Sequence, residues 1–432
     1  MKTEGGSGRH HKGAGAVFLE SKEQENKRLS KTYFIVVMAI LTVFSINGCS
    51  NKVKTAEADK ETEEYTAEEN TKMAPAPVLS DDIYSFQLKL NGKVYQFPMK
   101  YTEFAANGWV YDGDESEHLD SGYIAGTQVF AKEELEVYAD IINFDINAKP
   151  RSECYIAGIS VDNYQLDKAG ASAGTAKGIK IGKSTAAEIR AAYGTPGYEN
   201  TDDSGFTSIE YHIGMYQSIK FSIDSESKKL SKIQIQNYAE PEDFIPGEVS
   251  AEVPEAVGRY EAPDAVSNEF ADFTVNYSGA LYRLPAPVSV FEANGWKIVE
   301  GSSDMQAAGC SYGWVTLMKD NQTLKVIANN YSEQATSIRN CFVIKVKSDE
   351  FDAKVPITIA KGITIGMSQA DLETILSEDG YEKDDSSTLY VIYTVTPVEN
   401  TLDRYTIAVR KANSKVCKIE MEYTPQYSTF LN

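Results

Sequence analysis

The sequence predicts an α+β protein built from two tandem copies of a two-part unit, a mainly-β part followed by a helix packed on an antiparallel sheet. Three observations lead to this prediction. A pattern of aromatic, Asn, Gly and Trp residues recurs 187 residues further along the chain. Apolar residues alternate with polar ones over most of each copy, and a helical spacing of apolar residues appears once in each. A repeat at a fixed offset indicates the architecture before any propensity is considered.

Matched residues define the two copies. Residues 104–109 read Phe-Ala-Ala-Asn-Gly-Trp and residues 291–296 read Phe-Glu-Ala-Asn-Gly-Trp. The register later slips by three, so that Gly178-Ile-Lys-Ile-Gly182 is matched by Gly362-Ile-Thr-Ile-Gly366. The expected divisions are a signal peptide at 1–48, a disordered tether at 49–81, a first copy at 82–240 with parts 82–165 and 176–238, an acidic Pro-rich linker at 241–267, and a second copy at 268–425 with parts 268–352 and 360–423.

The first part of each copy reads as strands. In the first copy, Phe86, Leu88 and Leu90 alternate with polar residues, and Asn91-Gly92 is a strong hairpin signal. A short helix is expected next, closed by a glycine that follows its last residue. Further strands are expected at about 127–130, 136–143 and 154–161, with counterparts at 315–318, 323–330 and 341–347.

The second part changes from a strand period to a helix period. Thr185 and Glu188 have the spacing of a capping box at the start of a helix, and Ile189 begins its apolar face. The twin helix begins at Ser368. Alternating strands follow in both copies, so one helix packed on an antiparallel sheet is expected.

The N-terminal segment has the pattern of a targeting signal. Lys27, Arg28 and Lys31 precede an apolar run of 14 residues from Tyr33 to Ile46, which is shorter than the roughly 20 residues that span a bilayer. This pattern is typical of a signal peptide. Its end, Ile46-Asn-Gly-Cys49, resembles the lipobox of bacterial lipoproteins, which implies that Cys49 is acylated and becomes the first residue of the mature chain. An uncleaved signal anchor is the alternative.

Two further resemblances concern the repeat. Gly178-Ile-Lys-Ile-Gly182-Lys-Ser184, a short helix and Tyr193-Gly-Thr-Pro196 resemble the SmpA/OmlA (BamE-like) module, whose fold the β-lactamase inhibitory proteins share. The two-part unit as a whole resembles repeat lipoproteins of Gram-positive bacteria. Members of the small module bind proteins as adaptors or inhibitors, so the resemblance implies a protein partner and supplies no catalytic residue.

Charge and composition exclude some classes of function. The net charge is −21, which argues against nucleic acid as a partner because phosphate binding needs clustered Lys and Arg. Beyond the signal peptide the only histidines are His118 and His212. Few histidines are therefore available for a Ser-His-Asp or Cys-His catalytic centre. The sequence also contains no pair of Cys residues with the spacing of a zinc site and no phosphate-binding loop. We expect no catalytic residue, no metal site and no cofactor.

Three tryptophans are candidate binding residues because aromatic side chains anchor interfaces. Trp109 and Trp296 stand at the same point of the two copies, which also favours core positions. Trp314 has no aromatic counterpart, since Thr127 stands opposite it. It is the candidate least tied to packing.

Cysteine placement gives one disulfide hypothesis. Cys154 and Cys341 occupy equivalent strand positions and read as small buried residues. Cys310 and Cys417 belong to the second copy only, and an exported compartment permits a disulfide between them.

Taken together, these patterns predict a lipid-anchored protein on the extracytoplasmic face of the cell membrane. We expect a protein-interaction or adaptor module of the cell envelope, with an envelope protein as its partner. A surface lipoprotein that binds a solute or a glycan is the alternative. An envelope enzyme of unrecognised type is the third hypothesis.

Overall fold

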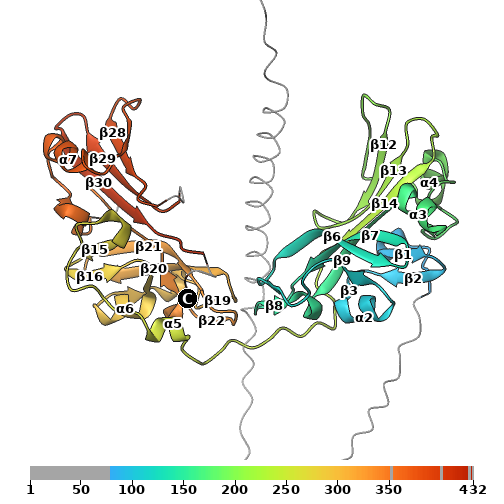
Figure 1. The fold of residues 1–432 in the computed structure, drawn as a ribbon, viewed down its shortest axis with the longest axis horizontal. Helices are drawn as coiled ribbons and strands as arrows, with labels where there is room; N and C mark the ends of the chain where they lie inside the picture. Colours follow the sequence, from blue (N-terminus) through green and yellow to red (C-terminus); the bar gives the residue numbers. More distant parts are fainter. Residues whose placement is uncertain (1–77, 351–353, 399–401, 427–429, 431–432) are drawn as a thin grey trace, which may run out of the picture. The chain divides into compact units, whose positions relative to one another are not determined.

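The computed structural model describes residues 78–350, 354–398, 402–426 and 430, and within them the chain is mainly β (Figure 1). Thirty strands and six α-helices lie in these described residues, and no helix there exceeds eight residues. The expected α+β class is therefore wrong. The helical patterns were real but short, and far more of the described residues lie in antiparallel strands than in helices. The signal peptide at 1–48 and the tether, apart from residues 78–81, lie outside the described residues.

The first repeat (82–240) begins with a hairpin of β1 (Gln87–Leu90) and β2 (Lys93–Gln96). Asn91 and Gly92 turn it with φ values of 50° and 87°, both positive as a type I′ turn requires. The hairpin turn predicted from Asn91-Gly92 is confirmed. β10 (Ala173–Gly174) adds a third strand to this small sheet.

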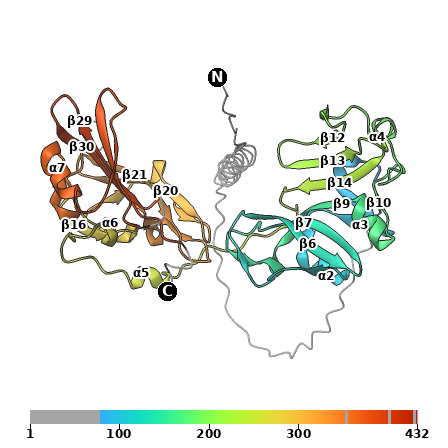
Figure 2. The ribbon, with the colours of Figure 1, turned by 45° about the horizontal axis from the view of Figure 1, so that its top comes forward.

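A nine-stranded antiparallel sheet forms the body of the first repeat (Figure 2). Its main path runs β11-β12-β13-β14-β9-β7-β6-β4, and β3 pairs with β9 beside that path. β9 is the central strand that joins the two expected parts into one sheet. The strands are β3 (Met99–Lys100), β4 (Val110–Tyr111), β6 (Ile124–Lys132), β7 (Leu135–Ile142), β9 (Tyr155–Asp162), β11 (Tyr198–Thr201), β12 (Thr207–His212), β13 (Gln217–Ile223) and β14 (Leu230–Asn237).

The two faces of this sheet differ in polarity because successive side chains point to opposite sides of a strand. On β14 the inward residues Ile233 and Ile235 are almost fully buried. Lys232 and Gln234 alternate with them and point to the other face. Three short helices complete the repeat: α2 (Tyr101–Ala106), α3 (Asn163–Ala169) and α4 (Ala186–Tyr193).

Helix α4 starts as the sequence predicts. Oγ1 of Thr185 accepts a hydrogen bond from the Glu188 amide at 3.3 Å, and the Glu188 carboxylate accepts one from the Thr185 amide at 2.7 Å. This is a reciprocal capping box, and it directs Ile189 into the core with no exposed surface. The capping-box prediction is confirmed.

The second repeat (268–425) has the same order of elements, but its large sheet is divided in two (Figure 1). Where the first repeat has the single strand β9, the second has β23 (Phe342–Val343) in one five-stranded sheet and β24 (Lys345–Asp349) in another. The two repeats are therefore not equal units. The remaining main elements are β15 (Thr274–Tyr277), β16 (Ala280–Arg283), β17 (Ala286–Pro287), α6 (Val288–Ala293), β18 (Lys297–Ile298), β20 (Tyr312–Lys319), β21 (Gln322–Asn329), β25 (Ile357–Ile359), β26 (Ile363–Thr364), α7 (Gln369–Leu376), β27 (Glu382–Asp384), β28 (Tyr390–Val395), β29 (Arg404–Arg410) and β30 (Lys415–Glu422).

Each repeat ends on an aromatic cluster that extends beyond its expected boundary. Phe244 lies against Phe144 and Tyr155, with ring centroids 6.1 and 5.9 Å away. In the second repeat Phe430 lies 4.2 Å from Tyr331 and 4.8 Å from Phe342. Phe144 and Tyr155 are equivalent to Tyr331 and Phe342 by the repeat offset of 187 residues. A similar aromatic cluster therefore packs at the end of each repeat.

The linker expected at 241–267 is packed rather than detached. Besides Phe244, the amide of Ser250 donates to the carbonyl of Ala335 at 2.8 Å. Helix α5 (Glu255–Gly258) buries Ala256. These contacts attach the acidic segment to folded structure along its length.

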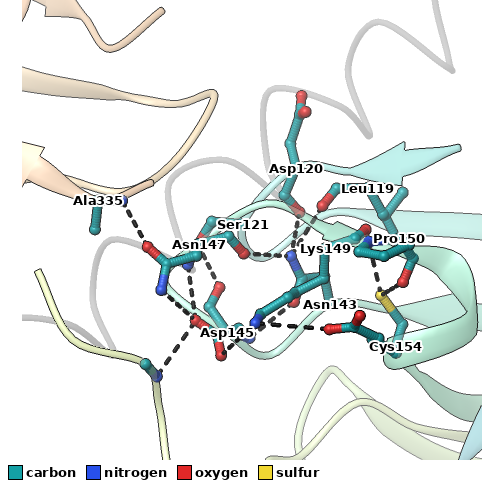
Figure 3. Close-up of polar contacts among 12 residues, drawn as sticks. Leu119, Asp120, Ser121, Asn143, Asp145, Asn147, Lys149, Pro150, Cys154 and Ala335 are labelled. Carbon is teal, nitrogen blue, oxygen red and sulfur yellow. Dashed lines mark hydrogen bonds and ion pairs between the residues drawn. The ribbon is translucent and has the colours of Figure 1, made fainter. Parts of the chain in front are cut away.

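A buried asparagine organises one loop in each repeat, Asn143 in the first and Asn330 in the second, and the two loops are hydrogen-bonded to each other. Figure 3 shows the loop of Asn143 and its contact with Ala335. Nδ2 of Asn143 donates to the carbonyls of Leu119 at 2.9 Å and Asn147 at 2.8 Å. Oδ1 of Asn147 then accepts the amide of Ala335 at 2.7 Å. The short pairs β5 (His118–Leu119) with β8 (Lys149–Pro150), and β19 (Gln306–Ala307) with β22 (Thr336–Ser337), flank these loops.

Candidate functional site

Two of the three candidate tryptophans are core residues. Trp109 is 3% exposed, and its Nε1 donates to the hydroxyl of Tyr95 at 3.1 Å. Trp296 is 1% exposed and stacks on Tyr277 with ring centroids 5.6 Å apart. Neither indole can meet a ligand, and the core position favoured by their equivalent placement is confirmed.

Trp314 is on the surface. It lies on β20 with half of its area exposed, and Tyr312 meets it edge to face at 6.4 Å. Met318 projects from the same side of the strand and is also exposed. The structure thus leaves Trp314 accessible on an apolar part of the second repeat.

The disulfide expected between Cys310 and Cys417 is not formed. Cys417 is buried on β30, where its thiol donates to the carbonyl of Ala408 at 3.4 Å. The thiol of Cys310 hydrogen-bonds to the carboxylate of Asp120 in the other repeat. Each sulfur has a hydrogen-bond partner other than the second cysteine, and sequence position alone could not reveal this. The expected lipidation site, Cys49, lies outside the described residues.

A small cavity lined largely by polar residues lies on the outer face of the nine-stranded sheet. Its volume is about 170 Å³. Residues from β6, β7, β9 and β14 meet around it because β9 pairs with both β7 and β14. The lining residues are Thr127, Tyr138, Asp140, Ile159, Ser160, Lys232 and Gln234.

The carboxylate of Asp140 is fixed on both oxygens by neutral donors. Oδ1 accepts the amide of Thr127 at 2.8 Å, and Oδ2 accepts the hydroxyl of Tyr238 at 2.7 Å. A carboxylate has about four acceptor positions, so each oxygen keeps capacity for a further donor. Asp140 is therefore oriented without being saturated.

Backbone irregularities aim these groups at the cavity. Thr127 has φ = 59°, in the left-handed region, where a β-branched residue is strained. It sits where the register of β6 against β7 shifts, between Ala125 and Gln128. A second shift follows Asp140 in the pairing of β7 with β9. Strain and bulges of this kind gather at functional sites.

Ser160 supplies an unsatisfied hydroxyl. It lies beside Tyr138 and Gln234 in the strand register, and its Oγ is buried with no hydrogen-bond partner among the described residues. A buried polar atom without a partner costs about 1–3 kcal/mol. This hydroxyl is therefore a ready contact for a molecule in the cavity.

The equivalent place in the second repeat is filled. Gly158, which faces Asp140, corresponds to Lys345 by the repeat offset. The Lys345 ammonium binds the carboxylates of Glu420 at 2.5 Å and Glu422 at 3.3 Å. Lys345 therefore occupies, in the second repeat, the position that Gly158 leaves without a side chain in the first.

A second cavity, of about 400 Å³, lies beside α5, and four of its ten lining residues are aromatic: Tyr260, Phe342, Tyr423 and Phe430. Phe342 and Phe430 also belong to the cluster that closes the second repeat. This cavity therefore lies at the edge of the aromatic cluster that ends the second repeat.

Sequence reasoning did not single out Asp140, Ser160 or Lys232. They are brought together by strand register, which is not readable from one sequence. A signal was present in the comparison of the copies, because Thr127, Asp140 and Gly158 stand opposite Trp314, Ile327 and Lys345. Two polar residues and a glycine in one copy thus stand opposite large or charged residues in the other.

Within the described residues, no group of three or more His, Cys, Asp or Glu side chains could hold a metal ion. In the same part of the chain no helix has the length and hydropathy needed to cross a membrane. In comparisons with known proteins, no family model, no curated protein and no solved structure matches the chain.

Proposed function

We propose that this chain is a membrane-anchored, non-catalytic binding protein that takes a small polar solute into the cavity around Asp140. One observation carries the proposal: the buried Ser160 hydroxyl lacks a partner in a cavity that also holds an oriented carboxylate. In small-molecule sites a few precisely placed polar groups orient the ligand within a largely apolar lining, and here Asp140 and Ser160 can take the orienting role. The volume of about 170 Å³ matches one small molecule or one unit of a glycan.

The anchoring part of the proposal rests on the sequence. The apolar run and the lipobox-like end at Cys49 support lipid attachment on the extracytoplasmic face. A Cys49→Ser variant should lose incorporation of labelled palmitate and leave the membrane fraction. Unchanged labelling of that variant would contradict it.

The test of binding is calorimetric titration of the full-length chain, purified in detergent, with amino acids, monosaccharides and polyols. Saturable binding that is lost in an Asp140→Ala variant supports the proposal. The Ile327→Ala variant is the matched control, because Ile327 occupies the equivalent place in the second repeat. An absence of binding across the series would refute it.

An adaptor of the cell envelope is the second candidate, and the exposed surface at Trp314 favours it. Trp314, Met318 and Met305 are each at least two-fifths exposed, and exposed aromatic and Met side chains are common anchors of protein interfaces. Cross-linking in cells, with wild type compared to Trp314→Ala, tests this candidate. Loss of one recurrent cross-linked envelope protein in the variant would support it.

A further inference from the structure

We propose that the solute bound around Asp140 is a zwitterion of amino-acid size, carrying one ammonium and one carboxylate group. This inference rests on the proposed binding function and specifies its ligand class. Asp140 is the acidic and Lys232 the basic side chain among the lining residues, so the cavity is lined by one group of each charge.

The side chains of Asp140 and Lys232 do not form an ion pair with each other. Within the described part of the chain, neither Asp140 nor Lys232 takes part in an ion pair closer than 4 Å. The partners of Asp140 are a backbone amide and a tyrosine hydroxyl, both neutral. The cavity thus offers a negative and a positive group that both remain available to a solute.

Strand register places the charges at opposite ends of the cavity. Asp140 pairs with Gly158, while Lys232 pairs with Asp162, four residues further along β9. With about 3.3 Å per residue and about 4.8 Å between strands, the two Cα atoms are on the order of 16 Å apart. The lysine side chain reaches back toward the cavity, and the remaining gap is the space that a small molecule can fill.

Neutral polar groups lie between the charges. Ser160 is midway between Gly158 and Asp162 on β9 and pairs with Gln234 on β14. Its unpartnered hydroxyl and the Gln234 amide can bind a further polar group, such as a hydroxyl, of a solute whose ammonium faces Asp140 and whose carboxylate faces Lys232. A neutral solute would leave both charges without a charged partner.

The second repeat satisfies the same sheet face internally. Lys345 binds Glu420 and Glu422, and the ammonium of Lys418 lies 3.1 Å from Glu420. Glu420 and Glu422 occupy the positions of Gln234 and Gln236, as the pairing of β24 with β30 shows. In the second repeat the chain's own side chains thus supply both the ammonium and the carboxylate groups on this face. In the first repeat the solute would supply both.

A divalent cation and a dianion fit less well. One carboxylate lines the cavity, whereas calcium takes six to eight oxygen ligands. A dianion would face Asp140 with like charge. The opposite charges instead match a molecule that carries both signs.

The experiment is calorimetric titration of the full-length chain with L-serine, ethanolamine, glycolate and glycerol as probes. L-serine carries both charges, ethanolamine only the ammonium, glycolate only the carboxylate, and glycerol neither. Because a hydrogen bond to a charged group contributes about 1.5–3 kcal/mol, we expect L-serine to bind about tenfold or more tightly than either singly charged probe.

Two variants test which charged group of the solute each residue binds. Asp140→Asn should remove the advantage of L-serine over glycolate, and Lys232→Gln should remove its advantage over ethanolamine. Lys418→Gln, at the equivalent position in the second repeat, is the control and should bind L-serine as wild type does. Circular dichroism of each variant checks that it is folded. Lys232 has no hydrogen-bond or ion-pair partner among the described residues, so its variant should retain the fold.

The outcomes separate this inference from the broader function. Equal affinity for glycerol or glucose and for L-serine, unchanged by Asp140→Asn, overturns the zwitterion while a polar-solute site stands. No binding of any probe or sugar overturns both. The charge-specific pattern in the two variants, without change in Lys418→Gln, supports the inference.

Discussion

The carboxylate of Asp140 occupies the space where residue 158 would carry a side chain. A Cβ built on Gly158 would overlap Oδ2 of Asp140 and lie 2.9 Å from its Cγ. The two residues pair directly across β7 and β9. Glycine is therefore required at position 158 for Asp140 to keep its two hydrogen bonds and face the cavity.

Gly158→Ala should displace the Asp140 carboxylate from the Thr127 amide and the Tyr238 hydroxyl. We expect solute affinity to fall about tenfold or more and the free energy of unfolding to fall by about 1–3 kcal/mol, as for an overpacked site. Titration and urea unfolding measure the two effects. Gly301→Ala is the control, since no atom lies within 4 Å of its added Cβ. Wild-type affinity in Gly158→Ala would show that Asp140 does not need this space.

Thr127→Gly should stabilise the protein. The left-handed backbone of Thr127, at φ = 59°, costs about 1–3 kcal/mol for a residue of this type, and glycine adopts that conformation without strain. Since glycine also loses more chain entropy on folding, we expect a net gain of about 1 kcal/mol in urea unfolding. Trp314→Gly changes the equivalent strand residue, which has no positive φ, and should give no gain. A destabilised Thr127→Gly would show that the position is not strained.

Asn143→Ala and Asn330→Ala should each cost about 3 kcal/mol of stability. The side-chain amide of Asn330 donates to the carbonyls of Ala308 and Gln334, both at 2.8 Å, as Asn143 does in its own loop. Removing the amide leaves several buried carbonyls without a donor. Asn107→Ala, whose amide makes one exposed contact to Glu103, should cost less than about 1 kcal/mol. Urea unfolding compares the three variants, and equal costs would contradict the role given to the buried pair.

Local features could be predicted from the sequence because their causes are local. The turn at Asn91 and the capping box at Thr185 depend on residues within four positions, and the burial of Trp109 follows from its repeated placement. The fold class could not be judged this way, because short helical patterns do not reveal how much of the chain pairs as strands. The cavity depends on residues 140 and 232, which meet only because β9 pairs on both sides.

Glu373 should make stability depend on acid pH. Its carboxylate on α7 accepts hydrogen bonds from Lys383 at 2.8 Å, Tyr393 at 2.5 Å and Gln369 at 3.2 Å. These contacts, that of Lys383 foremost, lower the pKa of Glu373 from 4.5 to about 2. Because the folded-state pKa lies below the unfolded value, the stabilisation is present above about pH 4.5 and is lost as the pH falls toward 2.

Glu373→Gln should remove that pH-dependent part. The side chain is about a third exposed, so solvent screening limits the expected loss at pH 7 to about 1 kcal/mol. Near pH 2 the variant and the wild type should differ less, because the wild-type carboxyl is then partly protonated. Urea unfolding at pH 7, 4 and 2.5 measures this convergence. Glu382→Gln, on the same strand as Lys383 and exposed, is the control and should follow wild type at every pH. A gap between Glu373→Gln and wild type that stays constant with pH would mean that the contacts at Glu373 do not depend on its charge.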